Sequence, residues 1–253
     1  MVLLGGHTAA QPAAPRFRVQ VLATLPHDNT MYTQGLEIAE GMLYEGSGQV
    51  GQSRVRTSAL SAATRSQTAE SPATVLREVA LPAPLFGEGL TVVGNRLWQL
   101  TWTNEVAIER DPTTLAERRR VAYQGEGWGL CNDGSRLVMS DGSDRLTFRD
   151  PASFAPTGQV AVRLDGDPVP QLNELDCTDG VVWANVYRTD RILRIDPTTG
   201  TVTGVVEAPD LLDADQQSTA DVLNGIAAIP GTDEFLITGK YWPVMFRVRF
   251  IPA

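Results

Sequence analysis

Cysteine and histidine are both scarce in this sequence of 253 residues, with two of each. Two cysteines cannot build a disulfide framework, and two histidines leave little material for a tetrahedral zinc site. Long apolar segments are also missing, since no run approaches the roughly 18 residues that a membrane-spanning helix needs. The sequence therefore predicts a soluble chain without a zinc centre.

Positively charged residues are also fewer than negatively charged ones. The chain has 21 Lys and Arg against 30 Asp and Glu, which gives a formal net charge of −9 at pH 7. Nucleic acid and anionic membrane surfaces would both repel such a chain. Neither is expected as a partner.

The N-terminal segment lacks the basic region and the full apolar region of a secretory signal peptide, although its small residues resemble the end of one. We expect a disordered tail at residues 1–15 and a single domain at residues 16–253. The small residues favour a periplasmic or secreted location. A chain of this length commonly forms one domain when it is all-β.

Five short motifs recur along the chain: TQGLEIAEGML, GEGLTVVGNRL, GWGLCNDGSRL, NELDCTDGVV and NGIAAIPGTDEFL. Their apolar anchors are Leu36, Leu90, Leu130, Leu175 and Ile226, so successive anchors are 54, 40, 45 and 51 residues apart. Periods of this size are typical of β-propellers. Each repeat holds alternating apolar and polar runs separated by turn residues, and none has a helical period. The pattern predicts an all-β fold of four-stranded antiparallel blades.

Both ends of the domain also alternate between apolar and polar residues. FRVQVLATL at 17–25 and MFRVRFI at 245–251 are expected to pair and so to close the ring. The 54-residue interval is explained by a Ser/Ala/Thr-rich loop at 58–74.

Large polar or hydrogen-bonding side chains stand two positions before the anchors, at what we call the channel positions: Gln34, Glu88, Trp128, Asn173 and Asn224. Equivalent positions on the first strands of propeller blades converge on one axis. Four of these residues precede a glycine, which we expect to let the backbone approach a ligand: Gly35, Gly89, Gly129 and Gly225. An ordinary polar, water-filled channel would also explain the pattern.

A second set lies on or just after the second strands of the repeats and is expected near the same mouth: Glu45, Trp102, Asn185 and Lys240. A carboxylate, an ammonium and indoles around one opening indicate a binding or catalytic site. Trp98 and Trp183 lie in apolar strand pairs and are expected in the core.

The chain resembles the glutamine cyclotransferase family, in its plant and bacterial form. The matching stretches run in order from about residue 17 to 252: YTQGLE, LYEGSGQVGQSRVR, LFGEGLT, LWQLTW, EGWGL, SDGS, LNELD, VWANVY, IDPTTG, LNGIA and TGKYWPVMF. The resemblance implies a five-bladed β-propeller that converts N-terminal glutamine to pyroglutamate with loss of ammonia. It also implies action on peptides or proteins without a catalytic metal or other cofactor, since the family is unrelated to the zinc-dependent animal enzymes, and it leaves open whether a structural calcium is bound. We expect a monomer.

Site residues follow from the same resemblance, except Asn224, which is expected from its position two residues before the anchor Ile226. The expected catalytic residues are Glu45 as general acid and base, with Lys240 and Asn185. The expected substrate-binding residues are Gln34, Glu88, Trp102, Trp128, Asn173, Glu174 and Asn224. Tyr187 departs from the family's VWANVW motif, where a tryptophan is familiar.

The same sequence is also compatible with other functions and with other roles for single residues. A propeller can bind peptides without chemistry, or act as a metal-dependent lactonase. Glu174 could instead accept hydrogen bonds from the backbone of the channel. Cys131 and Cys177 lie one and two residues past their anchors, so their side chains are expected on opposite sides of neighbouring strands, which argues against a disulfide.

Overall fold

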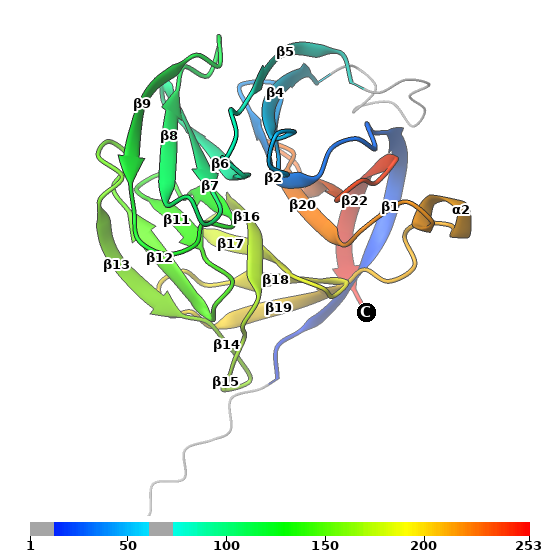
Figure 1. Cartoon of the computed structure of the whole chain (residues 1–253). Coiled ribbons are helices and arrows are strands. Elements are labelled where there is room, and N and C mark those ends of the chain that lie inside the picture. The colour runs from blue at the N-terminus through cyan, green and yellow to red at the C-terminus, as the bar shows by residue number, and fades with distance from the viewer. Residues whose placement is uncertain (1–12, 61–72) are drawn as a thin grey trace, which may run out of the picture.

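The computed structural model describes residues 13–60 and 73–253 (Figure 1). Residues 1–12 of the expected tail and residues 61–72 of the expected loop lie outside the described residues. Ala14 is buried, and its N–H donates to the carboxylate of Asp165 over 2.9 Å.

The described part of the chain is almost entirely β-structure, with one helix of four residues, α2 (Ala214–Gln217). The first four-stranded antiparallel sheet contains β2 (Thr33–Ala39), β3 (Met42–Ser47), β4 (Arg54–Ala59) and β5 (Val75–Ala80). The second contains β6 (Gly87–Val93), β7 (Arg96–Thr101), β8 (Val106–Arg110) and β9 (Glu117–Ala122). The third contains β10 (Leu130–Asn132), β11 (Leu137–Ser140), β12 (Arg145–Arg149) and β13 (Pro156–Ala161).

The remaining long strands form one eight-stranded sheet made of two antiparallel groups of four. One group contains β16 (Leu172–Thr178), β17 (Val181–Val186), β18 (Arg191–Ile195) and β19 (Val202–Glu207). The other contains β20 (Leu223–Ala228), β21 (Glu234–Gly239), β22 (Val244–Pro252) and β1 (Arg16–Pro26). A short hairpin of β14 (Arg163–Leu164) and β15 (Asp167–Pro168) stands apart.

The two ends of the chain meet in this sheet, as the alternating patterns predicted. β1 pairs antiparallel with β22 from Phe17 opposite Pro252 to Pro26 opposite Val244. On its other edge β1 pairs in parallel with β19. The pairing leaves β1 without an open edge along Arg16 to Arg18, where an exposed strand would invite association.

The first strands of the five four-stranded groups contact one another in a closed order: β2 with β6, β6 with β10, β10 with β16, β16 with β20, and β20 with β2. Figure 1 shows β2, β6, β16 and β20 near the middle of the molecule and β5, β9 and β13 at its periphery. All five sequence anchors lie on these first strands and are at most 1% exposed. The repeats found in the sequence therefore correspond to the five groups of strands.

Glycine residues after the channel positions serve these contacts between strands. A Cβ atom on Gly89 would lie 2.6 Å from the carbonyl oxygen of Trp128, and one on Gly35 would lie 2.8 Å from the backbone nitrogen of Leu90. The expectation that these glycines admit a ligand was wrong, because neighbouring backbone already occupies the space beside Gly35, Gly89 and Gly129, and threonine side chains lie beside Gly225. The Gly89 N–H donates to the Trp128 carbonyl over 2.8 Å.

Cys131 and Cys177 form a disulfide, with Cα atoms 5.4 Å apart. The expectation of two unpaired cysteines was wrong for a geometric reason. Cys131 lies on β10 and Cys177 on β16, which belong to different sheets that face each other. In two stacked sheets, the upper face of one sheet and the lower face of the other look into the same space. Cys131 is one residue and Cys177 two residues past its anchor, so their side chains point in opposite directions and meet in that space.

The core consists of apolar side chains packed between neighbouring sheets. Trp98 and Trp183 are both buried there, as predicted. No helix in the described ranges is long and apolar enough to cross a membrane.

Candidate active site

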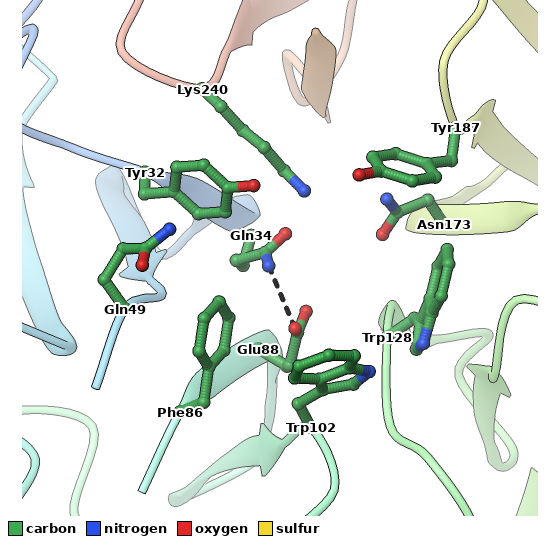
Figure 2. A pocket seen from close by; sticks show the side chains of 10 residues that line it. All are labelled: Tyr32, Gln34, Gln49, Phe86, Glu88, Trp102, Trp128, Asn173, Tyr187 and Lys240. Carbon is green, nitrogen blue, oxygen red and sulfur yellow. Dashed lines mark hydrogen bonds between the residues drawn. The ribbon is translucent and has the colours of Figure 1, made fainter. Parts of the chain in front are cut away.

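A pocket of about 200 Å³ opens where the first strands converge (Figure 2). Its volume is below the roughly 300–1,000 Å³ of common small-molecule sites, so it suits a single side chain. The lining residues are Tyr32, Gln34, Gln49, Phe86, Glu88, Trp102, Trp128, Asn173, Tyr187 and Lys240.

Two kinds of position supply this lining. Gln34, Glu88 and Asn173 stand early in the first strands β2, β6 and β16, so their side chains point into the middle of the ring. Trp102 and Lys240 come directly after the second strands β7 and β21, where the chain has reached the mouth. The repeated topology thus brings residues from distant parts of the sequence around one opening.

Glu88 is the carboxyl group in the pocket lining, and its side chain is 4% exposed. Its Oε1 accepts a hydrogen bond of 2.9 Å from Nε2 of Gln34. Oε2 has no partner among the described residues, and Figure 2 shows the free oxygen toward the open middle of the pocket. Burial raises the pKa of Glu88 well above its ordinary value, Lys240 lowers it, and Glu126 raises it further. A buried carboxyl with a raised pKa is suited to proton transfer.

Lys240 supplies the positive charge of the pocket and is 3% exposed. Its Nζ lies 4.7 Å from the ring centre of Tyr32 and 4.9 Å from that of Tyr187. No ion pair within 4.0 Å joins it to a carboxylate among the described residues. Burial lowers the pKa of Lys240, while Glu88 and Asp221 act in the opposite direction. Its ammonium is therefore held by ring faces and remains available to a ligand.

Glu126 orients both indoles of the pocket wall, a role that the sequence analysis did not predict. Its Oε2 accepts hydrogen bonds from Nε1 of Trp102 over 2.6 Å and from Nε1 of Trp128 over 2.9 Å. Trp102 is 39% exposed, so this wall reaches the surface.

Glu45, the residue expected to act as acid and base, lies outside the pocket lining and is 2% exposed. Arg56 donates to its Oε2 from Nε and Nη2 over 3.0 and 2.7 Å. Its Oε1 accepts from the hydroxyl of Thr33 and lies 2.8 Å from Nε2 of His27. Burial alone would raise the pKa of Glu45, but His27 and Arg56 lower it to about 2. Glu45 is thus a fully bound carboxylate inside β3.

His27 lies between two hydrogen-bond acceptors, an arrangement that favours its protonated form. Its Nδ1 faces the carbonyl oxygen of Trp242 and its Nε2 faces Glu45, each over 2.8 Å, and both partners accept hydrogen bonds. Burial lowers the pKa of His27, but Glu45 and the Trp242 carbonyl outweigh burial, so the net shift is upward. Through these two contacts His27 links β3 to the turn that follows Lys240.

Three other predicted site residues are buried beneath the pocket lining. Asn185 accepts from the Gly225 N–H, and Asn224 donates to the Thr33 carbonyl. Glu174 accepts from the N–H groups of Leu36 and Ile226, which confirms the alternative that it binds backbone. The six predicted site residues that the structure does bring together are Gln34, Glu88, Trp102, Trp128, Asn173 and Lys240.

Sequence reasoning left three lining residues out of the site, Tyr32, Gln49 and Phe86, and noted Tyr187 only as a departure from the family motif at the mouth. Tyr32 and Phe86 each stand two residues before a channel position, and alternate residues of an extended chain share a face. That spacing could have identified them. Tyr187 follows β17 directly, as Trp102 and Lys240 follow their second strands.

Asp176 lies in a separate cavity beside Glu37 and the disulfide. Burial raises the pKa of Asp176 to about 7, although its carboxylate accepts from the Ala228 N–H. At pH values between the pKa of Asp176 in the unfolded chain and its higher pKa in the folded state, Asp176 is protonated in the native state but ionised in the unfolded chain. The free energy of unfolding therefore falls as pH rises through this range.

Asp176→Asn is expected to remove this penalty. It should raise the free energy of unfolding by about 2 to 4 kcal/mol at pH 8 and leave it nearly unchanged at about pH 4. Denaturant titrations at the two pH values would measure both effects, with Asp179→Asn in the exposed turn after β16 as the control. An equal effect at both pH values would show that the charge of Asp176 is not the cause.

Within the described residues, no group of three or more His, Cys, Asp or Glu side chains is arranged to hold a metal ion.

Comparison with known proteins places the whole chain in one family. A family model described as glutamine cyclotransferase matches residues 2–250. A glutaminyl-peptide cyclotransferase of Arabidopsis thaliana is 35% identical over 240 residues, which cover 93% of this chain and 72% of the relative. The crystal structure of Myxococcus xanthus glutaminyl cyclase matches with a TM-score of 0.82 at 36% identity, over 95% of this chain and 99% of that one. The chain therefore belongs to the glutamine cyclotransferase family.

Proposed function

We propose that this protein is a glutaminyl-peptide cyclotransferase, which converts N-terminal glutamine to pyroglutamate and releases ammonia. The observation that carries the proposal is Glu88. Gln34 holds one of its oxygens, and the other faces a small pocket that also contains the Lys240 ammonium.

The architecture that we propose is a five-bladed β-propeller. Five four-stranded groups, whose first strands contact one another in a closed order, support it. The pairing of β1 with β22 completes the last group from both ends of the chain.

The reaction needs proton transfer and positioning rather than a protein nucleophile. The substrate's α-amine nitrogen forms a bond to the carbon of its own γ-carboxamide, which gives a tetrahedral intermediate. The bond from that carbon to the side-chain nitrogen then breaks. One proton leaves the attacking nitrogen and one is gained by the departing nitrogen, so a single carboxyl group can carry it.

We assign this proton transfer to Glu88 in place of Glu45. A general base must reach the proton that it abstracts. Glu88 has a free oxygen at the pocket, whereas both oxygens of Glu45 are occupied by His27, Thr33 and Arg56. The raised pKa of Glu88 also lets it return the proton, which a carboxyl with a pKa of about 2 does poorly.

Lys240 and Asn173 are suited to hold the reacting groups. The Lys240 ammonium can stabilise the negative oxygen of the tetrahedral intermediate. Oδ1 of Asn173 is buried at the pocket and has no hydrogen-bond partner among the described residues, so it can accept from a substrate N–H. The rings of Phe86, Trp102 and Trp128 form walls that fold the glutamine side chain toward its own amine.

The direct test is to incubate the purified protein with a glutamine-initiated dipeptide and to measure ammonia and the cyclised product. Stoichiometric release of both is expected, with no release from the matched dipeptide that begins with glutamate. Binding of the glutamine peptide without turnover would instead favour a peptide-binding propeller without chemistry.

Lys240→Met is expected to lower kcat/KM by about 100-fold, as loss of an oxyanion donor does. The melting temperature should stay within a few degrees of wild type, because the ammonium forms no close ion pair with a described carboxylate. Steady-state kinetics and thermal unfolding measure the two effects. Strong destabilisation with normal kcat/KM in the folded fraction would make Lys240 a structural residue.

Exhaustive chelation is expected to leave turnover intact while the protein remains folded, since the proton transfer assigned to Glu88 needs no Lewis acid. Activity before and after chelation, with circular dichroism as the control for folding, tests this. Loss of activity that zinc specifically restores would contradict the proposed mechanism.

The disulfide supports a periplasmic or secreted location, because such bonds persist in oxidising compartments.

A further inference from the structure

Asn224 lies in β20 directly beneath the pocket and is completely buried. Its Nδ2 donates two hydrogen bonds, one of 3.0 Å to the backbone carbonyl of Thr33 and one of 3.2 Å to Oε1 of Gln34. Its own Oδ1 has no partner among the described residues. Both N–H groups of Asn224 therefore donate to residues of β2, whereas its buried Oδ1 is left without a partner.

The Thr33 carbonyl fixes the direction of these hydrogen bonds. A backbone carbonyl can only accept, so the atom of Asn224 that faces it must be the NH₂ group. The second N–H of the same group then requires an acceptor, and the amide of Gln34 must present its oxygen. The NH₂ group of Gln34 consequently points away from Asn224, toward Oε1 of Glu88 at 2.9 Å.

We propose that Asn224 is a positioning residue that sets the orientation of the Gln34 amide and, through it, the protonation of Glu88. The proposal rests on the proposed function, in which Glu88 carries the proton. An N–H donated by Gln34 stabilises the carboxylate form of Glu88, which can accept a proton from the substrate's amine. With the amide reversed, the Gln34 oxygen could interact well only with protonated Glu88.

Other groups around Glu88 do not replace this interaction. The Lys240 ammonium favours the carboxylate and Glu126 disfavours it. The phenols of Tyr32 and Tyr123 also lie close enough for their ionised forms to be disfavoured by a charged Glu88. Among the described residues, the Gln34 N–H is the only group that donates a hydrogen bond to either carboxylate oxygen of Glu88. Its direction therefore has a large influence on the proton.

The test begins with Asn224→Leu, which keeps a similar side-chain volume and removes both N–H donors. Asn224→Ser serves as a second variant, since its short hydroxyl cannot replace the contact with Gln34. The control is Asn132→Leu, the same substitution on the first strand β10, where the amide donates only to the Val92 carbonyl.

The first measurement is the pKa of Glu88, from carboxyl ¹³C chemical shifts of glutamate-labelled protein, with the Glu88 signal assigned by its loss in Glu88→Gln. Both Asn224 variants should raise this pKa by about one unit, and Asn132→Leu should not move it. An unchanged pKa in a folded Asn224 variant would overturn the proposal, whatever its activity.

The second measurement is a double-mutant cycle with Gln34→Met, which has no amide to orient. In the wild-type background Asn224→Leu should lower kcat by about 10-fold and change KM by less than about threefold. In the Gln34→Met background it should have almost no further effect on kcat or on the Glu88 pKa. Additive effects would mean that Asn224 acts independently of Gln34 and would overturn the proposal.

The two proposals fail in different ways. If Glu88→Gln keeps full activity while Asn224→Leu still shifts the Glu88 pKa, the proposed role of Glu88 is wrong and the role of Asn224 stands. If Glu88→Gln is inactive and the Asn224 variants leave the pKa unchanged, the reverse holds.

Discussion

Glu88→Gln is expected to lower kcat by about 10²- to 10⁴-fold, the range typical of a lost general acid and base. The amide has nearly the shape of the carboxyl group but cannot carry the proton from the attacking amine to the leaving nitrogen. Substrate binding should persist, since the aromatic walls, Asn173 and Lys240 are unchanged. Ammonia release under saturating dipeptide measures kcat, and titration with a substrate analogue that cannot cyclise measures binding.

The folded state should tolerate this change. The buried carboxyl has a raised pKa, so replacing it with a neutral amide removes a group whose charge is costly to bury. A melting temperature at or above that of wild type is expected, with Glu117→Gln at the exposed strand β9 as the control for loss of a surface charge. Near-normal turnover in Glu88→Gln would remove this residue from the mechanism.

Glu45→Gln is expected to lower the free energy of unfolding by about 3 to 5 kcal/mol, as when one member of a buried ion pair is removed. The change leaves His27 without its carboxylate and Arg56 with Asp28 alone, which it contacts over 2.8 Å. The kcat of the folded fraction should fall by less than about 10-fold, because Glu45 does not reach the pocket.

Acid should have the same effect on the wild-type protein. The pKa of Glu45 is about 2 in the folded state and about 4.5 in the unfolded chain, so its contribution is complete above the unfolded value. It is lost as pH falls toward about 2. Denaturant unfolding of Glu45→Gln and wild type at neutral and acidic pH measures this, and a difference that persists at pH 2 would contradict it.

The repeats and the pairing of the chain ends could be predicted from the sequence because both are local patterns. An apolar anchor such as Leu90 and the alternation in 17–25 each state which face of a strand is buried. The channel positions followed from the same period, so Gln34, Glu88 and Asn173 were found without knowing their contacts.

The position of Glu45 could not be obtained in this way, because it depends on residues far apart in the sequence. Glu45 and Asn185 lie inside their second strands, where side chains enter the space between sheets. Trp102 and Lys240 follow theirs and reach the mouth. The clue available in the sequence was Arg56, which stands directly across from Glu45 in the neighbouring strand.

The cysteines show the same limit. The sequence correctly predicts that the two side chains point in opposite directions. Whether this separates them or brings them together depends on whether the two strands belong to one sheet or to two stacked sheets. Two strands of one sheet would separate them, whereas the stacked strands β10 and β16 join them.

The most direct test of the account is a single-turnover measurement of pyroglutamate formation by Glu88→Gln and Glu45→Gln side by side, at a pH and temperature where both are folded. The assignment of the proton transfer to Glu88 predicts that Glu45→Gln forms product within about 10-fold of the wild-type rate and that Glu88→Gln is slower by at least about 100-fold. A fast Glu88→Gln enzyme beside a slow but folded Glu45→Gln enzyme would contradict it.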